Sequence, residues 1–272
     1  MRAPLALLLL FALALGLSAC GSEESSAPAS EDAVALAANT TGDLGSYKAD
    51  ISSTIEVAGQ SLEMEGTGEF DSAAQRGHAS YTTTVAGQTL DLEFVYALPA
   101  MYIQYPDGLL PGIPEDKTWV KIDMDKLGQQ QGLDLGQLMQ AGQTDPSQWL
   151  QYLRGTTDIE TVGDEVVRGV STTHYKGVVD LQRFAKEDPA LEKTFHQLVY
   201  ETGISRIPVE VWIDEDNLVR RMKQTMEGAT VGPGAQIDMT MTTELYDFGT
   251  KVDVAEPPAD EVTDLEDLLG RS

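Results

Sequence analysis

The sequence predicts an α+β fold, in which a long, curved antiparallel sheet of about ten or eleven strands forms an open half-barrel around a few helices. Three observations predict it. Apolar and polar residues alternate through most segments after residue 46, as in antiparallel strands with one wet face. Few segments have a helical pattern, and the apolar side of so many strands needs a covering layer. A twisted sheet that curls around the helices is the simplest such arrangement.

The first half of the chain supplies one helix and about six strands. Residues 31–41 predict a short helix, with Ser30 as its N-cap and acidic residues in its first turn. Alternating strands follow, with turns at Gly59 and Gly87. These strands cover residues 47–57, 62–70, 76–85, 90–96, 101–105 and 118–124.

The middle of the chain changes character. Residues 126–155 are rich in Gln, Leu and Gly, and a helix is predicted after Asp145-Pro146, which suit the N-cap and the first helical position. A strand pair comes next, followed by a helix at 181–200 that is broken near Pro189. Three long strands and a short acidic tail helix complete the chain. The strand pair and these last four elements cover residues 159–167, 170–179, 207–213, 218–227, 235–248 and 260–269.

The N-terminus carries the pattern of an export signal. Arg2 precedes an apolar run from Leu5 to Leu17, and the small residues Ser18 and Ala19 lead to the only cysteine, Cys20. The run of about 13 residues is too short to span a bilayer. The Leu-Ser-Ala-Cys pattern resembles the bacterial lipobox, whose cysteine is lipidated; the alternative is an ordinary signal peptide with an incidental cysteine. Lipidation of Cys20 would anchor the chain to the extracytoplasmic face of the cell membrane.

These boundaries divide the chain into three parts. Residues 1–19 are predicted to be a lipoprotein signal peptide, residues 20–30 a flexible tether, and residues 31–272 a single domain. The hydrophobic content of 42% is enough for one full core. The net charge of −26 argues against nucleic-acid binding and against docking on anionic lipids through a basic patch.

The reactive residues predict no enzyme, no cofactor and no metal site. Cys20 is assigned to the anchor, and His78, His174 and His196 share no metal-ligand spacing. No Gly-X-Ser-X-Gly nucleophile elbow occurs. The acidic run 214–216 lacks the central Gly and distal Glu of a calcium loop, so it predicts a hairpin turn.

Several motifs resemble a known family. They are TWVKID at 118–123, VVRGVSTTHYKGVVDL at 166–181, IPVEVWIDEDNLVRRM at 207–222 and LYDFGTKVDVAEPPADEV at 245–262. With the lipobox, this order resembles the LppX/LprG/LprA/LprF group of envelope lipoproteins, which are similar to the periplasmic carrier LolA. The resemblance implies a LolA-like half-barrel with helices in its mouth, which binds acylated lipids or lipid-modified proteins. Its motifs mark the fold and no catalytic site.

The resemblance and the strand phase together define a candidate acyl-chain cavity. Methionines recur on the inward phase of three strands, where each either fills the core or lines a cavity that adapts to its ligand. The strand residues expected to line it are Leu62, Met64, Leu90, Leu92, Phe94, Val211, Ile213, Met222, Met239 and Met241. From the helices, Trp149, Phe195 and Leu198 are expected to close its mouth.

Two functions are therefore predicted. In the first, the lipid-anchored protein binds the acyl chains of a lipid or glycolipid and carries or presents them in the cell envelope. In the second, the same fold has a filled core and serves as a sensor or adaptor for a protein partner, which the sequence does not name.

Overall fold

A computed structural model describes residues 30–57, 59–85, 87–104, 116–124, 152–183, 202–231 and 235–269, and single positions at 106, 114, 126, 150, 196, 199 and 200. The predicted signal peptide with Cys20, the predicted helix after Asp145-Pro146 up to residue 149, and most of the predicted helix at 181–200 lie outside the described residues. So do Trp149, Phe195 and Leu198.

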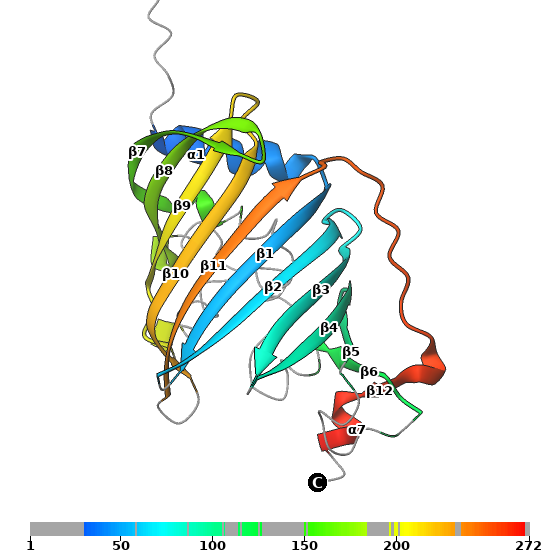
Figure 1. Cartoon of the computed structure of the whole chain (residues 1–272). Helices are drawn as coiled ribbons and strands as arrows, with labels where there is room; N and C mark the ends of the chain where they lie inside the picture. Colours follow the sequence, from blue (N-terminus) through cyan, green and yellow to red (C-terminus); the bar gives the residue numbers. More distant parts are fainter. Residues whose placement is uncertain are drawn as a thin grey trace, which may run out of the picture.

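The described residues form one curved sheet with a helix across one of its ends (Figure 1). The strand order is β12-β6-β5-β4-β3-β2-β1-β11-β10-β9-β8-β7. Every pairing is antiparallel except that of β12 with β6. The strands are β1 (Ser46–Val57), β2 (Gln60–Asp71), β3 (Arg76–Val85), β4 (Gln88–Ala97), β5 (Ala100–Gln104), β6 (Trp119–Asp123), β7 (Thr156–Val167), β8 (Val170–Asp180), β9 (Arg206–Asp214), β10 (Val219–Val231), β11 (Ala235–Tyr246) and β12 (Val262–Asp264). The predicted open antiparallel sheet is confirmed, with a strand count slightly above the expected ten or eleven.

The predicted tail helix at 260–269 is wrong in its first half. A 3₁₀ turn, η1 (Ala259–Glu261), leads into β12, and only α7 (Leu265–Leu269) is helical. In β12, Val262 pairs in parallel with Trp119 of β6. The free edge of β6 offers backbone partners, and the β-branched Val262 and Thr263 suit a strand. The local sequence pattern of residues 260–269 contains no information about the edge of β6, which is distant in the sequence.

Helix α1 (Ser30–Asp43) confirms the prediction of a short helix, and it covers one end of the sheet beside β7, β9 and β10. Its buried residues among those described are Ala33, Val34, Ala37, Ala38 and Thr41, which share one helical face. The three alanines allow the helix to approach the strands closely. The hydroxyl of Thr41 accepts a hydrogen bond from the backbone N–H of Val219 at 2.8 Å, which ties α1 to the start of β10.

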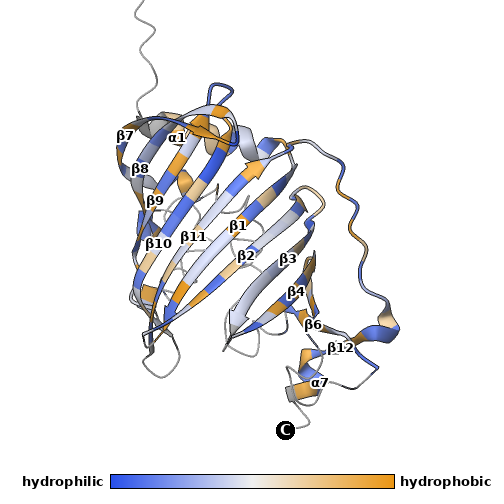
Figure 2. Ribbon diagram, in the orientation of Figure 1, coloured by the Kyte–Doolittle hydropathy of each residue, from blue (hydrophilic) through white to orange (hydrophobic). Residues whose placement is uncertain are grey.

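The strand register separates the sheet into two surfaces of opposite character. In β1, the side chains of Tyr47, Ala49, Ile51, Ser53 and Ile55 lie on one surface, which we call the apolar face. Alternate positions such as Lys48, Asp50 and Glu56 lie on the opposite, polar face. Figure 2 shows the resulting alternation of hydrophobic and hydrophilic positions along the strands.

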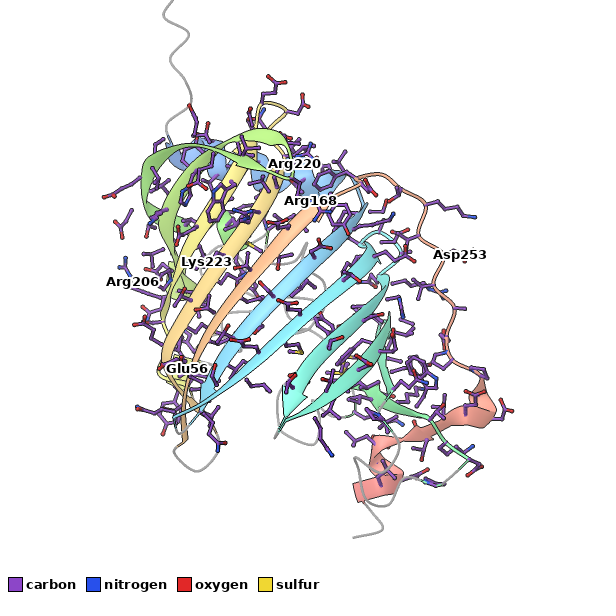
Figure 3. The ribbon with its side chains drawn as sticks, viewed as in Figure 1. Glu56, Arg168, Arg206, Arg220, Lys223 and Asp253 are labelled. Atoms are coloured by element: carbon purple, nitrogen blue, oxygen red, sulfur yellow. The ribbon has the colours of Figure 1, made fainter. Side chains whose placement is uncertain are left out.

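The β7–β8 hairpin folds over the polar face at the α1 end. Its turn residues Arg168 and Gly169 have φ angles of 50° and 81°, as a tight type I′ turn requires at both central positions. Arg168 forms ion pairs with Asp50 of β1 and Glu244 of β11. The tip of the hairpin therefore reaches across β9 and β10 to the central strands β11 and β1, near whose α1 ends Figure 3 shows Arg168.

Candidate functional site: the apolar face of the sheet

The register places all ten strand residues of the predicted cavity on the apolar face. Met64 and Met241 flank Ser53 on opposite sides of β1, and Leu62 and Met239 flank Ile55 in the same way. Farther along the sheet, Leu92 lies opposite Tyr81, and on the other side Val211 lies opposite Met222. Leu90, Phe94 and Ile213 lie on the same face. Their contact with a ligand stays a prediction.

Packing on the apolar face weakens with distance from α1. Close to the helix, Tyr47, Phe70 and Leu245 are at most 2% exposed. Toward the opposite end of the strands, Leu62, Met64 and Met239 are only half-buried by the described residues, and Val57 is 37% exposed. The site that best suits an apolar ligand is thus at the end of the sheet away from α1.

The predicted lining residues fall into two groups by burial. Val211, Ile213 and Met222 belong to the buried core, in which Phe94 and Met241 also pack as half-buried members. The remaining five are half-buried, and they are Leu62, Met64, Leu90, Leu92 and Met239. The first group acts as core in this structure, whereas the second offers apolar surface.

Aromatic rings and glycines fill the apolar face of β2, β3 and β4. A series of ring contacts runs from Tyr47 through Phe70, Tyr96 and Phe94 to Tyr81, with centroids 5.3–6.2 Å apart. Glycines leave room for these rings: a Cβ atom on Gly68 would come within 2.7 Å of the Phe70 ring. Burial raises the pKa of Tyr81, which a hydrogen bond with Tyr96 partly offsets. This part of the face is therefore packed.

One buried polar side chain on the apolar face was not anticipated. Gln224 is 2% exposed and lies between Met222 and Met226 along β10, with Met241 opposite it in β11. Its Oε1 atom has no hydrogen-bond partner in the described part of the chain. A signal was available, because Gln224 interrupts an otherwise apolar phase of β10.

The polar face contains a hollow of about 640 Å³ over β11, β1, β2 and β3. Its lining is dominated by carboxylates and hydroxyls, including Asp50, Glu65 and Glu244, with Thr67 and Ser80. Two of the carboxylates are neutralised, because Arg168 pairs with Asp50 and Arg221 pairs with Glu244. The character of this hollow does not suit an acyl chain.

His174 is buried on the polar face between two carboxylates. Its Nδ1 atom lies 3.0 Å from Glu165, and its Nε2 atom lies 2.9 Å from Glu210. Its ring stacks on Trp212 with centroids 4.1 Å apart. A hydrogen bond from the indole N–H of Trp212 is the main cause that lowers the pKa of Glu165, and the hydrogen bond with His174 lowers it further. These contacts hold the β7–β8 hairpin on the sheet.

The acidic run 214–216 lies where β9 turns into β10. Asp214 accepts hydrogen bonds from the backbone N–H groups of Asp216 and Leu218 and from the Nε atom of Arg220, so the acidic run is a hairpin turn, as predicted. Within the described residues, no group of three His, Cys, Asp or Glu side chains could hold a metal ion. None of the described helices is long and apolar enough to cross a membrane.

The sequence is related to two curated proteins, although no family model matches it. One is an uncharacterized 31.2 kDa protein of Streptomyces griseus, 26% identical over 159 residues, which cover 56% of this chain and 50% of the relative. The other is a putative lipoprotein of Streptomyces coelicolor, 26% identical over 269 residues, which cover 93% of this chain and 82% of the relative. The chain thus resembles a lipoprotein along nearly its whole length. This similarity supports the resemblance predicted from the motifs.

Two solved structures are also similar to this chain. LppX of Mycobacterium tuberculosis is 16% identical with a TM-score of 0.47, and the match covers 85% of this chain and all of LppX. LprF of Mycobacterium bovis is 14% identical with a TM-score of 0.48, and the match covers 85% of this chain and 98% of LprF.

Proposed function

We propose that the protein is a lipid-anchored envelope lipoprotein that binds the acyl chains of a lipid or glycolipid on its apolar face and carries or presents them. The observation that carries this proposal is the continuous apolar face, which loses packing toward the end away from α1. There Leu62, Met64 and Met239 remain half-buried. The similarity to a putative lipoprotein supports the same class of function.

The energy of hydration explains why such a face is useful. Each buried CH₂ group is worth about 0.8 kcal/mol, so exposing a chain of about sixteen carbons to water costs roughly 13 kcal/mol. Membrane and protein both offer an apolar environment, so a carrier needs no catalytic group and only moderate affinity. Its task is to keep the chain out of water.

The anchor would limit the position of the sheet relative to the membrane. Ser30, the first residue of α1, comes ten positions after Cys20. A fully extended segment of that length spans at most about 36 Å. If Cys20 is lipidated, the start of α1 therefore stays within about 36 Å of the membrane surface. Replacing Cys20 with Ser should release the protein from membranes.

Native mass spectrometry tests acyl binding directly. The full chain carrying Cys20→Ser, purified without detergent from bacterial cells, should carry the mass of one or more co-purified lipids. The variant Leu92→Trp tests the location of the lipid. It enlarges a half-buried residue on the apolar face and should reduce the bound lipid. A lipid-free mass, together with failure to bind added fatty acid, would exclude the proposal.

A filled core is the second candidate, and a specific observation favours it. Val211, Ile213 and Met222 are each at most 5% exposed, so this part of the apolar face is packed. Met241→Trp distinguishes the two functions. In a filled core, the larger ring costs about 1–3 kcal/mol of stability. In a core that accepts lipid, the melting temperature is unchanged and the co-purified lipid is lost.

A further inference from the structure

The buried amide of Gln224 stands apart from the other buried polar side chains. Most of these have partners: the hydroxyl of Thr83 donates to the carbonyl of Glu63 at 2.7 Å, and that of Thr172 donates to the carbonyl of Glu165 at 2.9 Å. The Oε1 atom of Gln224 has none within the described residues. Leaving a buried acceptor unsatisfied costs free energy, so each instance calls for an explanation.

The four side chains that directly flank Gln224 on the apolar face are apolar. Met222 and Met226 precede and follow it on the same face of β10, Met241 lies across from it in β11, and Val209 lies across from it in β9. None of these four side chains can donate a hydrogen bond to the amide oxygen. Thr243, two positions from Met241 in β11, carries a hydroxyl on the same face, but Oε1 accepts no hydrogen bond from it or from any other described residue. A partner for Oε1 must therefore come from outside the described residues.

Three of these neighbours are methionines, which can move aside. An unbranched thioether side chain has several rotatable bonds and adapts to irregular partners. Met226 and Met241 are only half-buried and pack at the margin of the core. A ligand that lies on the adjacent apolar surface can thus reach the amide by displacing methionines rather than backbone.

We infer that the Oε1 atom of Gln224 accepts a hydrogen bond from a hydroxyl or amide N–H group of an acyl ligand held on the apolar face. This inference rests on the proposed function and adds a chemical requirement to it. The preferred ligand carries a hydrogen-bond donor on or next to its acyl chain, as hydroxylated or amide-linked fatty acids do. A plain hydrocarbon chain would leave the amide oxygen unsatisfied.

Thr156 is the other buried side chain with an unpaired oxygen among the described residues, and it carries less weight. It lies in the first position of β7, the edge strand of the sheet, and its methyl group packs where a Cβ atom of Gly177 would be. A rotatable hydroxyl at a strand end has more ways to find a partner than an amide in the centre of an apolar face.

Binding measurements with a small panel of fatty acids test the inference. The probes are stearate, 2-hydroxystearate, 3-hydroxystearate, 12-hydroxystearate and N-stearoylglycine, titrated into the Cys20→Ser chain after bound lipid has been removed. At least one chain with a donor should bind about three- to tenfold more tightly than stearate, which is the value of one hydrogen bond. The hydroxylated probes and the amide probe distinguish the two sources of the donor.

Two variants assign the preference to the amide. Gln224→Met keeps the size of the side chain and removes the acceptor, so it should equalise the panel by weakening only the chains with a donor. Met226→Leu, a neighbour without an acceptor, should keep the wild-type preference. If wild type binds stearate as tightly as every other probe, or if Gln224→Met keeps the preference, the inference is wrong and the proposed function stands. If no probe binds, both fail.

Discussion

The guanidinium group of Arg168 lies 3.9 Å from the centre of the Tyr246 ring, although Arg168 belongs to the β7–β8 turn and Tyr246 ends β11. The Tyr246 hydroxyl donates to Asp50 at 2.8 Å, and Asp50 also pairs with Arg168. With the ion pair to Glu244, one edge hairpin is thereby attached to the central strands through a single cation, a ring and two carboxylates. The hairpin thus depends on contacts between residues far apart in sequence.

Removing this cation should loosen the hairpin without unfolding the sheet. Arg168→Met loses both ion pairs and the ring contact. Since Arg168 is partly exposed, we expect a loss of about 0.5–1.5 kcal/mol in the free energy of unfolding. Urea unfolding of this variant, of Tyr246→Leu and of the double variant gives the coupling energy between the two residues. Additive effects would show that the ring contact contributes nothing.

The glycines beneath the aromatic rings predict a stronger effect. A Cβ atom on Gly66 would lie 2.6 Å from the carbonyl oxygen of Ser80 and even closer to the Tyr81 ring. Gly66→Ala should therefore lower the free energy of unfolding by about 1–3 kcal/mol. Gly42→Ala in α1 is the matched control, because its Cβ atom would meet nothing within 4 Å. Gly42→Ala should raise the free energy of unfolding by about 0.5–1 kcal/mol through helix propensity. If Gly66→Ala left the free energy of unfolding unchanged, the close packing of the Tyr81 ring on Gly66 would be refuted.

Strand phase could be predicted from the sequence because a period of two is a local property. A turn at Gly59, whose φ angle is 79°, joins the alternating residues of β1 to those of β2. The turn fixes the pairing of Ser53 with Met64, and the pairing fixes the shared face. The same logic placed all ten strand residues of the predicted cavity on one surface.

The remaining features depend on contacts that no local pattern contains. The tail forms β12 because the edge of β6 is free, and the two segments are far apart in sequence. The surroundings of His174 require Glu165 from β7 and Glu210 from β9, which only the folded sheet brings together. Likewise, the polar Gln224 is visible in the sequence, but its missing partner is not.

Alkaline pH should weaken the attachment of the C-terminal segment to the sheet. Burial and then the hydrogen bond to Glu256 raise the pKa of Tyr102 to about 12 from an ordinary value of 10.0. The folded protein keeps this proton where the unfolded chain has lost it, so the stability that Tyr102 contributes is present below pH 10 and is lost between about pH 10 and 12. In urea unfolding, Tyr102→Phe should lose stability less steeply than wild type across this window. Equal slopes would contradict the assignment.

Acid pH should act near the other edge of the sheet, through Glu165 of β7. The indole N–H of Trp212 donates to the Glu165 carboxylate at 2.8 Å, and this bond is the main cause of its lowered pKa. The stability that the carboxylate contributes is therefore present above its unfolded pKa and is lost as the pH falls through the lower folded value. Trp212→Phe keeps a ring that can stack on His174 but removes the donor. Carbon-detected NMR titration should show the pKa of Glu165 rising toward its ordinary value in this variant, with a weaker loss of stability in acid.

Lys48→Met, which removes an exposed cation paired with Asp247, serves as the control and should leave the Glu165 titration unchanged. An unaltered titration in Trp212→Phe would mean that His174 alone holds the carboxylate ionised.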